Sequence, residues 1–312
     1  MISHTDHSPL SKSILKTLLY FDIFRYPLTA AEVFKHLTTN HVTPDDVTRA
    51  LAQLSDQSII YPIADFYSIH NNLALGSRRI KGNQMAIGSL LLARKRAKFI
   101  SKFPFVRAVM ASGSLSKDYM DEHSDLDFFV ITKPNRLWIA RMLLVLYKKI
   151  FLFNSHKHFC INYYVDEDHL EIEEKNIFTA SELATLIPLY GKEHYLQLMS
   201  TNHWIKKYLP NHTPRPVENV AAYEPRWVKR KLEGIINLAG AKTLERFFIR
   251  LLAKRWEERY KAAYSKSDFE VAFKTKEYVS KGHPNNHQRK VLELYQQKLD
   301  DFATRLNINW NE

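Results

Sequence analysis

Residues 109–131, VMASGSLSKDYMDEHSDLDFFVI, contain two apolar runs separated by a polar loop. The first run ends at Gly113-Ser114, the loop covers residues 115–124, and the second run opens with Asp125-Leu126-Asp127. Residues i and i+2 of a strand point to the same face, so a strand over residues 125–131 would hold both carboxylates side by side. Like charges that close repel unless a cation lies between them, and carboxylate oxygens suit hard ions such as Mg²⁺. The stretch therefore predicts a metal-binding pair of aspartates next to a glycine turn.

The segments around this stretch predict a mixed α/β domain. Residues 105–111 and 159–165 have the apolar, β-branched and aromatic composition of strands, whereas residues 78–102 and 136–151 have helical periodicity. The helix over 78–102 is strongly basic, and Pro104 follows its end. The predicted order is helix, strand, glycine turn, aspartate strand, helix and strand, with helices flanking a mixed sheet.

An N-terminal module is predicted over residues 1–75. Three helical segments, the second starting with the capping box Thr29-x-x-Glu32, precede two short strands over 58–62 and 65–69. Three helices followed by a two-stranded ribbon are typical of a winged helix. The third helix carries Asp45 and Asp46, whereas phosphate contacts need lysine and arginine, so a structural or protein-binding role is favoured over DNA reading.

The C-terminal third is expected to be helical and basic. After a proline-rich linker over residues 208–216, helical patterns cover 226–238, 242–264 and 286–306, and another helix starts near Ser181. A short strand is also expected over 170–172. These patterns divide the chain into a winged-helix-like module (1–75), a central α/β domain (76–222) and a helical C-terminal region (223–312).

Composition limits the classes of protein that the chain can belong to. Its 312 residues are 45% hydrophobic, which is enough for a substantial core. The only cysteine, Cys160, excludes an intrachain disulfide and a cysteine-built zinc site. The first ten residues lack the pattern of a signal peptide, and the most apolar segment, 137–153, is interrupted by charges. We therefore expect a cytoplasmic protein without a membrane span.

The net charge of +12 is concentrated in two blocks. Residues 76–155 carry 15 basic and 5 acidic side chains, and residues 226–312 carry 19 and 11. Such blocks favour polyanionic partners, among them nucleotide phosphates, nucleic acid bound through the basic helices, or an anionic membrane surface. The alternative is that they are simply solvated helix faces.

The predicted order of elements and its central motif resemble the nucleotidyltransferase fold of the DNA polymerase beta superfamily. That signature is Gly-Ser, about ten residues, then Asp-x-Asp in an apolar strand, and the resemblance covers about residues 80–170. It implies a transfer of a nucleoside monophosphate from a nucleoside triphosphate to an acceptor hydroxyl, the acceptor being unidentified. Asp125 and Asp127 would hold Mg²⁺, two ions being expected in an active enzyme. Gly113 and Ser114 would bind the triphosphate, with Ser124 and Lys117 as further candidates.

The chain departs from this family at the third carboxylate. Active members usually present it on the next strand, where the central polar residue here is Asn162, which carries no charge and cannot act as a base. Asp166 and Asp168 follow that strand, and either could supply the third carboxylate, although aspartates at such positions are typical of turns. Two alternatives therefore remain open, a catalytically degenerate nucleotide-binding or regulatory protein on the same fold and a DNA-binding regulator that uses the winged helix.

Overall fold

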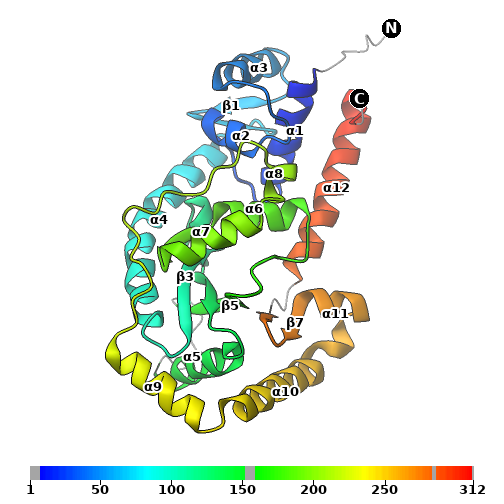
Figure 1. Ribbon diagram of the computed structural model, residues 1–312. Helices are drawn as coiled ribbons and strands as arrows, with labels where there is room; N and C mark the ends of the chain where they lie inside the picture. Colours follow the sequence, from blue (N-terminus) through cyan, green and yellow to red (C-terminus); the bar gives the residue numbers. More distant parts are fainter. Residues whose placement is uncertain (1–7, 152–158, 283–285, 311–312) are drawn as a thin grey trace.

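The centre of the molecule is a six-stranded mixed sheet with helices on both faces (Figure 1). The computed structural model describes residues 8–151, 159–282 and 286–310. The strand order is β6-β3-β4-β5-β8-β7; β4 and β5 are parallel, and every other neighbouring pair is antiparallel. The strands are β3 (Val106–Ser112), β4 (Asp127–Thr132), β5 (Cys160–Asp166), β6 (Ile187–Tyr190), β7 (Phe273–Lys276) and β8 (Val279–Gly282). The predicted mixed α/β class is confirmed.

Strand β4 lies inside the sheet and is apolar on both faces. Phe128 and Val130 pack with α4 (Leu73–Ile100) and α5 (Leu137–Phe151) in one hydrophobic cluster. Phe129 and Ile131 belong to a second cluster, with α6 (Ile177–Thr185) and α7 (Lys192–Thr201) on the other face. The predicted alternation is therefore present, but the strand begins at Asp127 rather than at Asp125.

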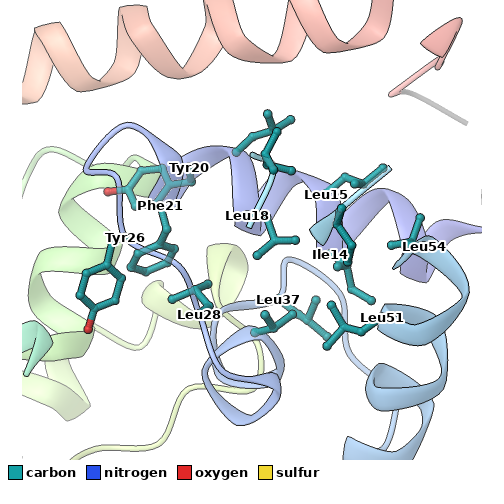
Figure 2. Close-up of a cluster of buried hydrophobic side chains, with 14 of the residues drawn as sticks. Ile14, Leu15, Leu18, Tyr20, Phe21, Tyr26, Leu28, Leu37, Leu51 and Leu54 are labelled. Atoms are coloured by element: carbon teal, nitrogen blue, oxygen red, sulfur yellow. The ribbon is translucent and has the colours of Figure 1, made fainter. Parts of the chain in front are cut away.

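The N-terminal module has the predicted elements. They are α1 (Pro9–Asp22), α2 (Ala30–His36), α3 (Pro44–Asp56) and an antiparallel pair made of β1 (Tyr61–Ile63) and β2 (Phe66–Ser68). The predicted capping box of Thr29 and Glu32 starts α2. Figure 2 shows the core of this module, in which Ile14 and Leu18 of α1 lie near Leu37 and Leu51. Helix α12 (His287–Leu306) packs against the same core, although it lies at the other end of the sequence.

The C-terminal region departs from the expected all-helical pattern. It contains α9 (Trp227–Leu238), α10 (Ala241–Tyr260), the single turn η2 (Lys261–Ala263), α11 (Lys266–Ala272) and α12, and the short α8 (Ile205–Tyr208) precedes it. The predicted helix over 242–264 therefore ends early, and β7 and β8 follow it as a hairpin that joins the sheet beside β5. The edge strand β7 alternates lysines with Phe273 and Thr275, and β8 carries Ser280 and Lys281, so neither strand has the apolar periodicity by which strands are predicted.

Two other sequence-based predictions were wrong. Residues 170–172 form no strand, and the helix expected to begin near Ser181 is the second half of α6, which starts at Ile177. Asn176 caps α6 by accepting a hydrogen bond from the Thr179 amide at 2.9 Å.

None of the helices in the described ranges is long and apolar enough to cross a bilayer.

Two buried glutamates attach α9 and α10 to the α/β domain. Glu233 of α9 accepts hydrogen bonds from the amide of Phe105 at 2.7 Å and from Arg107 Nη1 at 3.1 Å. Glu245 of α10 accepts the amides of Trp138 and Ile139 at 2.7 and 3.0 Å. Those two amides belong to the first turn of α5 and have no intrahelical partner, so Glu245 caps α5 from another helix.

Replacing Glu245 with alanine should destabilise the protein. The change leaves two buried amides without an acceptor, which should lower the free energy of unfolding by about 2 kcal/mol. Glu257→Ala, on the same helix with a side chain that is 54% exposed, is the matched control and should change it little. Urea unfolding of both variants measures the difference, and equal stabilities would contradict the capping role of Glu245.

Candidate functional site

The carboxylate of Asp127 lies directly against the backbone of Gly113. Asp127 pairs with Ser112 in the β3–β4 register, so the glycine turn and the first residue of β4 are adjacent. Gly113 has φ +64°, and a Cβ added to it would lie 2.4 Å from Asp127 Oδ2. Glycine is therefore required twice, once for the backbone conformation and once for the space that the carboxylate occupies.

A cavity of about 800 Å³ opens beside this contact. It has space for a ligand of nucleotide size, within the usual range for small-molecule sites. The residues that line it include Gly113, Ser114, Lys117, Asp125, Asp127, Arg141, Lys148, Cys160, Asn162, Glu182 and Trp256. One cavity thus contains the predicted carboxylates of Asp125 and Asp127, the predicted glycine turn, and Asn162.

Asn162 occupies the position beside Asp127 because β5 is irregular there. The β4–β5 register shifts between Phe128 and Phe129, so that Ile161 and Tyr163 pair with β4 and Asn162 lies between them. Its Nδ2 donates to Asp127 Oδ1 at 2.7 Å, and Cys160 Sγ donates to its Oδ1 at 3.1 Å. The position at which the resemblance predicts a third carboxylate therefore holds a neutral amide, which is hydrogen-bonded to Asp127.

Burial disfavours the charge of Asp127. Desolvation, joined by the negative charges of Asp125 and Glu182, raises the pKa of Asp127 to about 6, although Cys160 and Lys117 act in the opposite direction. Burial also raises the pKa of the Cys160 thiol to about 12, so this group stays protonated at neutral pH. Asp125, Asp127 and Glu182 thus place three carboxylates at one part of the cavity, and a cation bound between Asp125 and Asp127 would favour the charged form of Asp127.

Lys117 and Glu182 form an ion pair at the edge of the cavity. Lys117 Nζ lies 2.7 Å from Glu182 Oε1 and also donates to the Gly113 carbonyl at 3.3 Å. Lys117 belongs to the single turn η1 (Leu115–Lys117), which follows Ser114 directly. Sequence reasoning missed Glu182, since it is one acid in a helix with no motif around it, and only the packing of α6 on the sheet brings it here.

The two predicted serines lie in different surroundings. Ser114 is half-buried and lines the cavity next to Gly113. Ser124 instead closes a turn, because its hydroxyl donates to Asp121 Oδ1 at 2.7 Å and accepts from the Asp121 amide at 3.0 Å. A third serine, Ser116, holds the glycine turn in place by donating from its buried hydroxyl to the Gly113 carbonyl at 2.8 Å.

The two alternative carboxylates are remote from the site. Asp166 ends β5, whereas Asp127 pairs with Cys160 at its start, and six residues of strand span about 20 Å. Asp166 is buried and bonds His169 Nδ1 at 2.7 Å, and the Asp168 amide donates to it at 3.2 Å. Both aspartates therefore stabilise the turn that follows β5.

Cations and aromatic rings line another part of the cavity. The buried guanidinium of Arg141 lies 4.9 Å from the ring centroid of Tyr164 and 5.0 Å from that of Trp256. Within the described ranges, Arg141 Nε and Nη1 have no hydrogen-bond partner. Burial lowers the pKa of Lys148, while the charge of Asp125 partly opposes that shift. Trp256 belongs to α10, so the C-terminal region contributes to the same cavity.

The third helix of the N-terminal module offers little to a phosphate backbone. Arg49, its only basic residue, is ion-paired with Asp46 on its own surface, and Asp45 is exposed beside it. Arg49 is thus already engaged by Asp46, and the cavity that contains Asp125 and Asp127 remains the candidate site. Among the residues that the structure describes, no group of three or more histidine, cysteine, aspartate or glutamate side chains is arranged to hold a metal ion.

Comparisons of the chain with protein-family models, with curated proteins and with solved structures found no match.

The raised pKa of Asp127 predicts an unusual dependence of stability on pH in metal-free buffer. Its pKa is about 6 in the folded protein, above the ordinary value of 3.8, so ionisation of Asp127 opposes folding. The free energy of unfolding should fall as the pH rises from about 4 to 6 and then stay level. Asp127→Asn removes this penalty and should be more stable than the wild type at pH 7, by about 3 kcal/mol at most.

Chemical unfolding with EDTA at several pH values measures this effect. The advantage of Asp127→Asn should disappear near pH 4, where the wild-type carboxyl is protonated. Asp301→Asn, an exposed substitution on α12, is the control and should leave the pH profile unchanged. A destabilised Asp127→Asn at pH 7 would show that the carboxylate is stabilised by its surroundings rather than penalised.

Proposed function

We propose that this chain is a Mg²⁺-dependent nucleotidyltransferase, which moves a nucleoside monophosphate from a nucleoside triphosphate to an acceptor hydroxyl. The observation that carries the proposal is the contact of the Asp127 carboxylate with the Gly113 backbone at the cavity. It joins a glycine turn, at which phosphates can approach the backbone closely, to a carboxylate pair that suits hard cations.

The residues at the site fit Mg²⁺. Mg²⁺ in nucleotide sites keeps several waters and needs only one or two carboxylates in addition to the substrate phosphates. Asp125 and Asp127 supply those carboxylates, and a bound cation would offset the burial and the like charges that raise the pKa of Asp127. When bound, the ion would supply charge neutralisation of the triphosphate and orientation of the reacting oxygens.

The other cavity residues have roles that follow from their charge and place. Ser114 and the backbone of Gly113 would donate to the terminal phosphates. Lys117 lies beside this turn and would offset the charge of the phosphates. From sequence alone, Lys117 could equally be a solvated loop lysine. Its ion pair with Glu182 keeps the ammonium group oriented toward the turn.

A second proposal has its own supporting observation. The Asn162 amide donates a hydrogen bond to Asp127 Oδ1 at 2.7 Å. A carboxylate at position 162 would instead repel the Asp127 carboxylate. A chain that binds a nucleotide without transferring it needs no proton acceptor at this position. We therefore keep a degenerate nucleotide-binding or regulatory protein as the alternative function on the same site.

Calorimetry with ATP, CTP, GTP and UTP in the presence of Mg²⁺ tests the site that both proposals share. The wild type should bind at least one of them, and Asp125→Asn/Asp127→Asn should weaken that binding by roughly 100-fold because both cation ligands are lost. Asp301→Asn is again the control. Wild-type protein that binds no triphosphate, or a double variant with unchanged affinity and metal dependence, would rule out the site.

Asn162→Asp then separates the two functions. Pyrophosphate release by the wild type in the presence of a triphosphate and candidate acceptors identifies an enzyme. Release that appears only in Asn162→Asp identifies a degenerate site, because the variant restores the missing carboxylate. The variant should also respond more strongly to Mg²⁺ in a thermal unfolding experiment, since its new carboxylate faces Asp127 and needs a cation between them.

A further inference from the structure

Helices α9 and α10 expose an unusual amount of apolar surface. The described residues include 16 large hydrophobic side chains that are exposed, and seven of them fall within residues 227–251. In α9, Leu238 is 90% exposed, Trp227 67% and Ile235 62%. Phe247 and Leu251, one turn apart in α10, add to them. The two helices lie along the lower edge of the molecule in Figure 1, and the turn that follows Leu238 is at its lowest point.

The exposed side chains lie opposite the face by which each helix is attached. In α9, Lys229 and Glu233 are buried one turn apart, so residues such as Ile235 and Leu238 turn outward. In α10, Glu245 and Leu252 are buried, and Phe247 lies on the other side. The outward apolar stripe is thus not part of the core, and the described part of the chain does not cover it.

The same surface is strongly basic. Residues 226–260 contain ten basic and four acidic side chains. Two of the four acids, Glu233 and Glu245, are buried and bonded to the α/β domain, so their charges do not face outward. Only Lys229 of the ten cations is buried, where its Nζ donates to the carbonyls of Ser101 and Val106 at 2.8 and 2.5 Å.

We propose that the outward face of α9 and α10 binds the surface of an anionic lipid bilayer. Amphipathic helices rich in lysine and arginine, with tryptophan, phenylalanine and leucine among them, bury their apolar side chains at the boundary between headgroups and acyl chains. Here Lys231 Nζ lies 5.0 Å from the ring centroid of Trp227, so a cation and an aromatic ring are in contact at the start of α9. The basic side chains around the stripe then meet the phosphates of the headgroups.

Two other partners fit this face less well. Nucleic acid would contact the lysine and arginine side chains through its phosphates and could stack its bases on aromatic rings. Neither contact would cover the exposed leucine and isoleucine side chains. A second protein subunit would use the apolar side chains, but the centres of such interfaces are depleted of lysine. Only a bilayer with anionic headgroups matches both the charge and the aliphatic side chains.

Membrane binding through this face leaves the cavity open to its ligand. Trp256 and Tyr260 of α10 line the cavity, and Trp256 lies on the opposite side of the helix from Phe247. The proposal does not depend on which reaction the cavity supports, so it can fail or succeed independently of the proposed function.

Vesicle flotation of the full chain tests the proposal. The protein should float with vesicles of phosphatidylcholine mixed with phosphatidylserine, should bind vesicles of phosphatidylcholine alone roughly tenfold more weakly, and should be released by high salt. Ile235→Ser/Leu238→Ser should reduce binding roughly tenfold because the apolar insertion is lost. Ile87→Ser/Leu91→Ser, on α4 with exposures of 70% and 58%, is the matched control and should bind as the wild type does.

A charge variant completes the test. Arg246→Glu/Arg250→Glu should abolish binding to the anionic vesicles, whereas Arg94→Glu/Lys98→Glu, an exposed basic pair at the same spacing on α4, should not. Three results would overturn the proposal. They are absence of binding to anionic vesicles, equal binding by the Ile235/Leu238 variant, and a wild-type dimer in light scattering that this variant converts to a monomer.

Discussion

The candidate site is built around one close contact, in which the Asp127 carboxylate lies against the backbone of Gly113, a residue without a Cβ. Asp127 begins an inner strand, is partly buried, and lies so close to Gly113 that any larger residue at position 113 would displace its carboxylate. The β3–β4 register brings the two residues together, and Ser116 keeps the turn closed from behind. A fold that buries a carboxylate in this way loses stability unless a cation or a proton compensates the charge. Binding of a cation at this carboxylate would offset that loss of folding stability.

Segments from both ends of the chain enclose this site. The hydroxyl of Tyr26, at the end of the N-terminal core, donates to the carbonyl of Lys117 in the turn beside Gly113. Trp256 of α10 reaches the cavity from the C-terminal region, and β8 extends the sheet next to β5. Attachment of α9 and α10 through Glu233 and Glu245 fixes this side of the cavity and at the same time orients the basic, apolar face outward.

Much of this architecture could be predicted from local sequence, because local chemistry determines it. Asp127, Phe128 and Phe129 alternate as a strand requires, and Thr29 and Glu32 begin a helix by bonding each other's backbone. The bulge that turns Asn162 toward Asp127 could not be predicted, since it depends on how β5 pairs with β4. Glu182 and Trp256 were missed for the same reason, because each reaches the cavity only through the packing of its helix.

The central claim is that Asp125 and Asp127 hold a divalent cation beside the Gly113 turn. Paramagnetic broadening by Mn²⁺, a substitute for Mg²⁺ with the same preference for oxygen ligands, tests this claim most directly. At low Mn²⁺ concentration, the amide NMR signals of Gly113, Asp125 and Asp127 should broaden first, and Asp127→Asn should abolish the effect. Broadening that instead begins at exposed acids such as Asp300 and Asp301 of α12 would contradict the account.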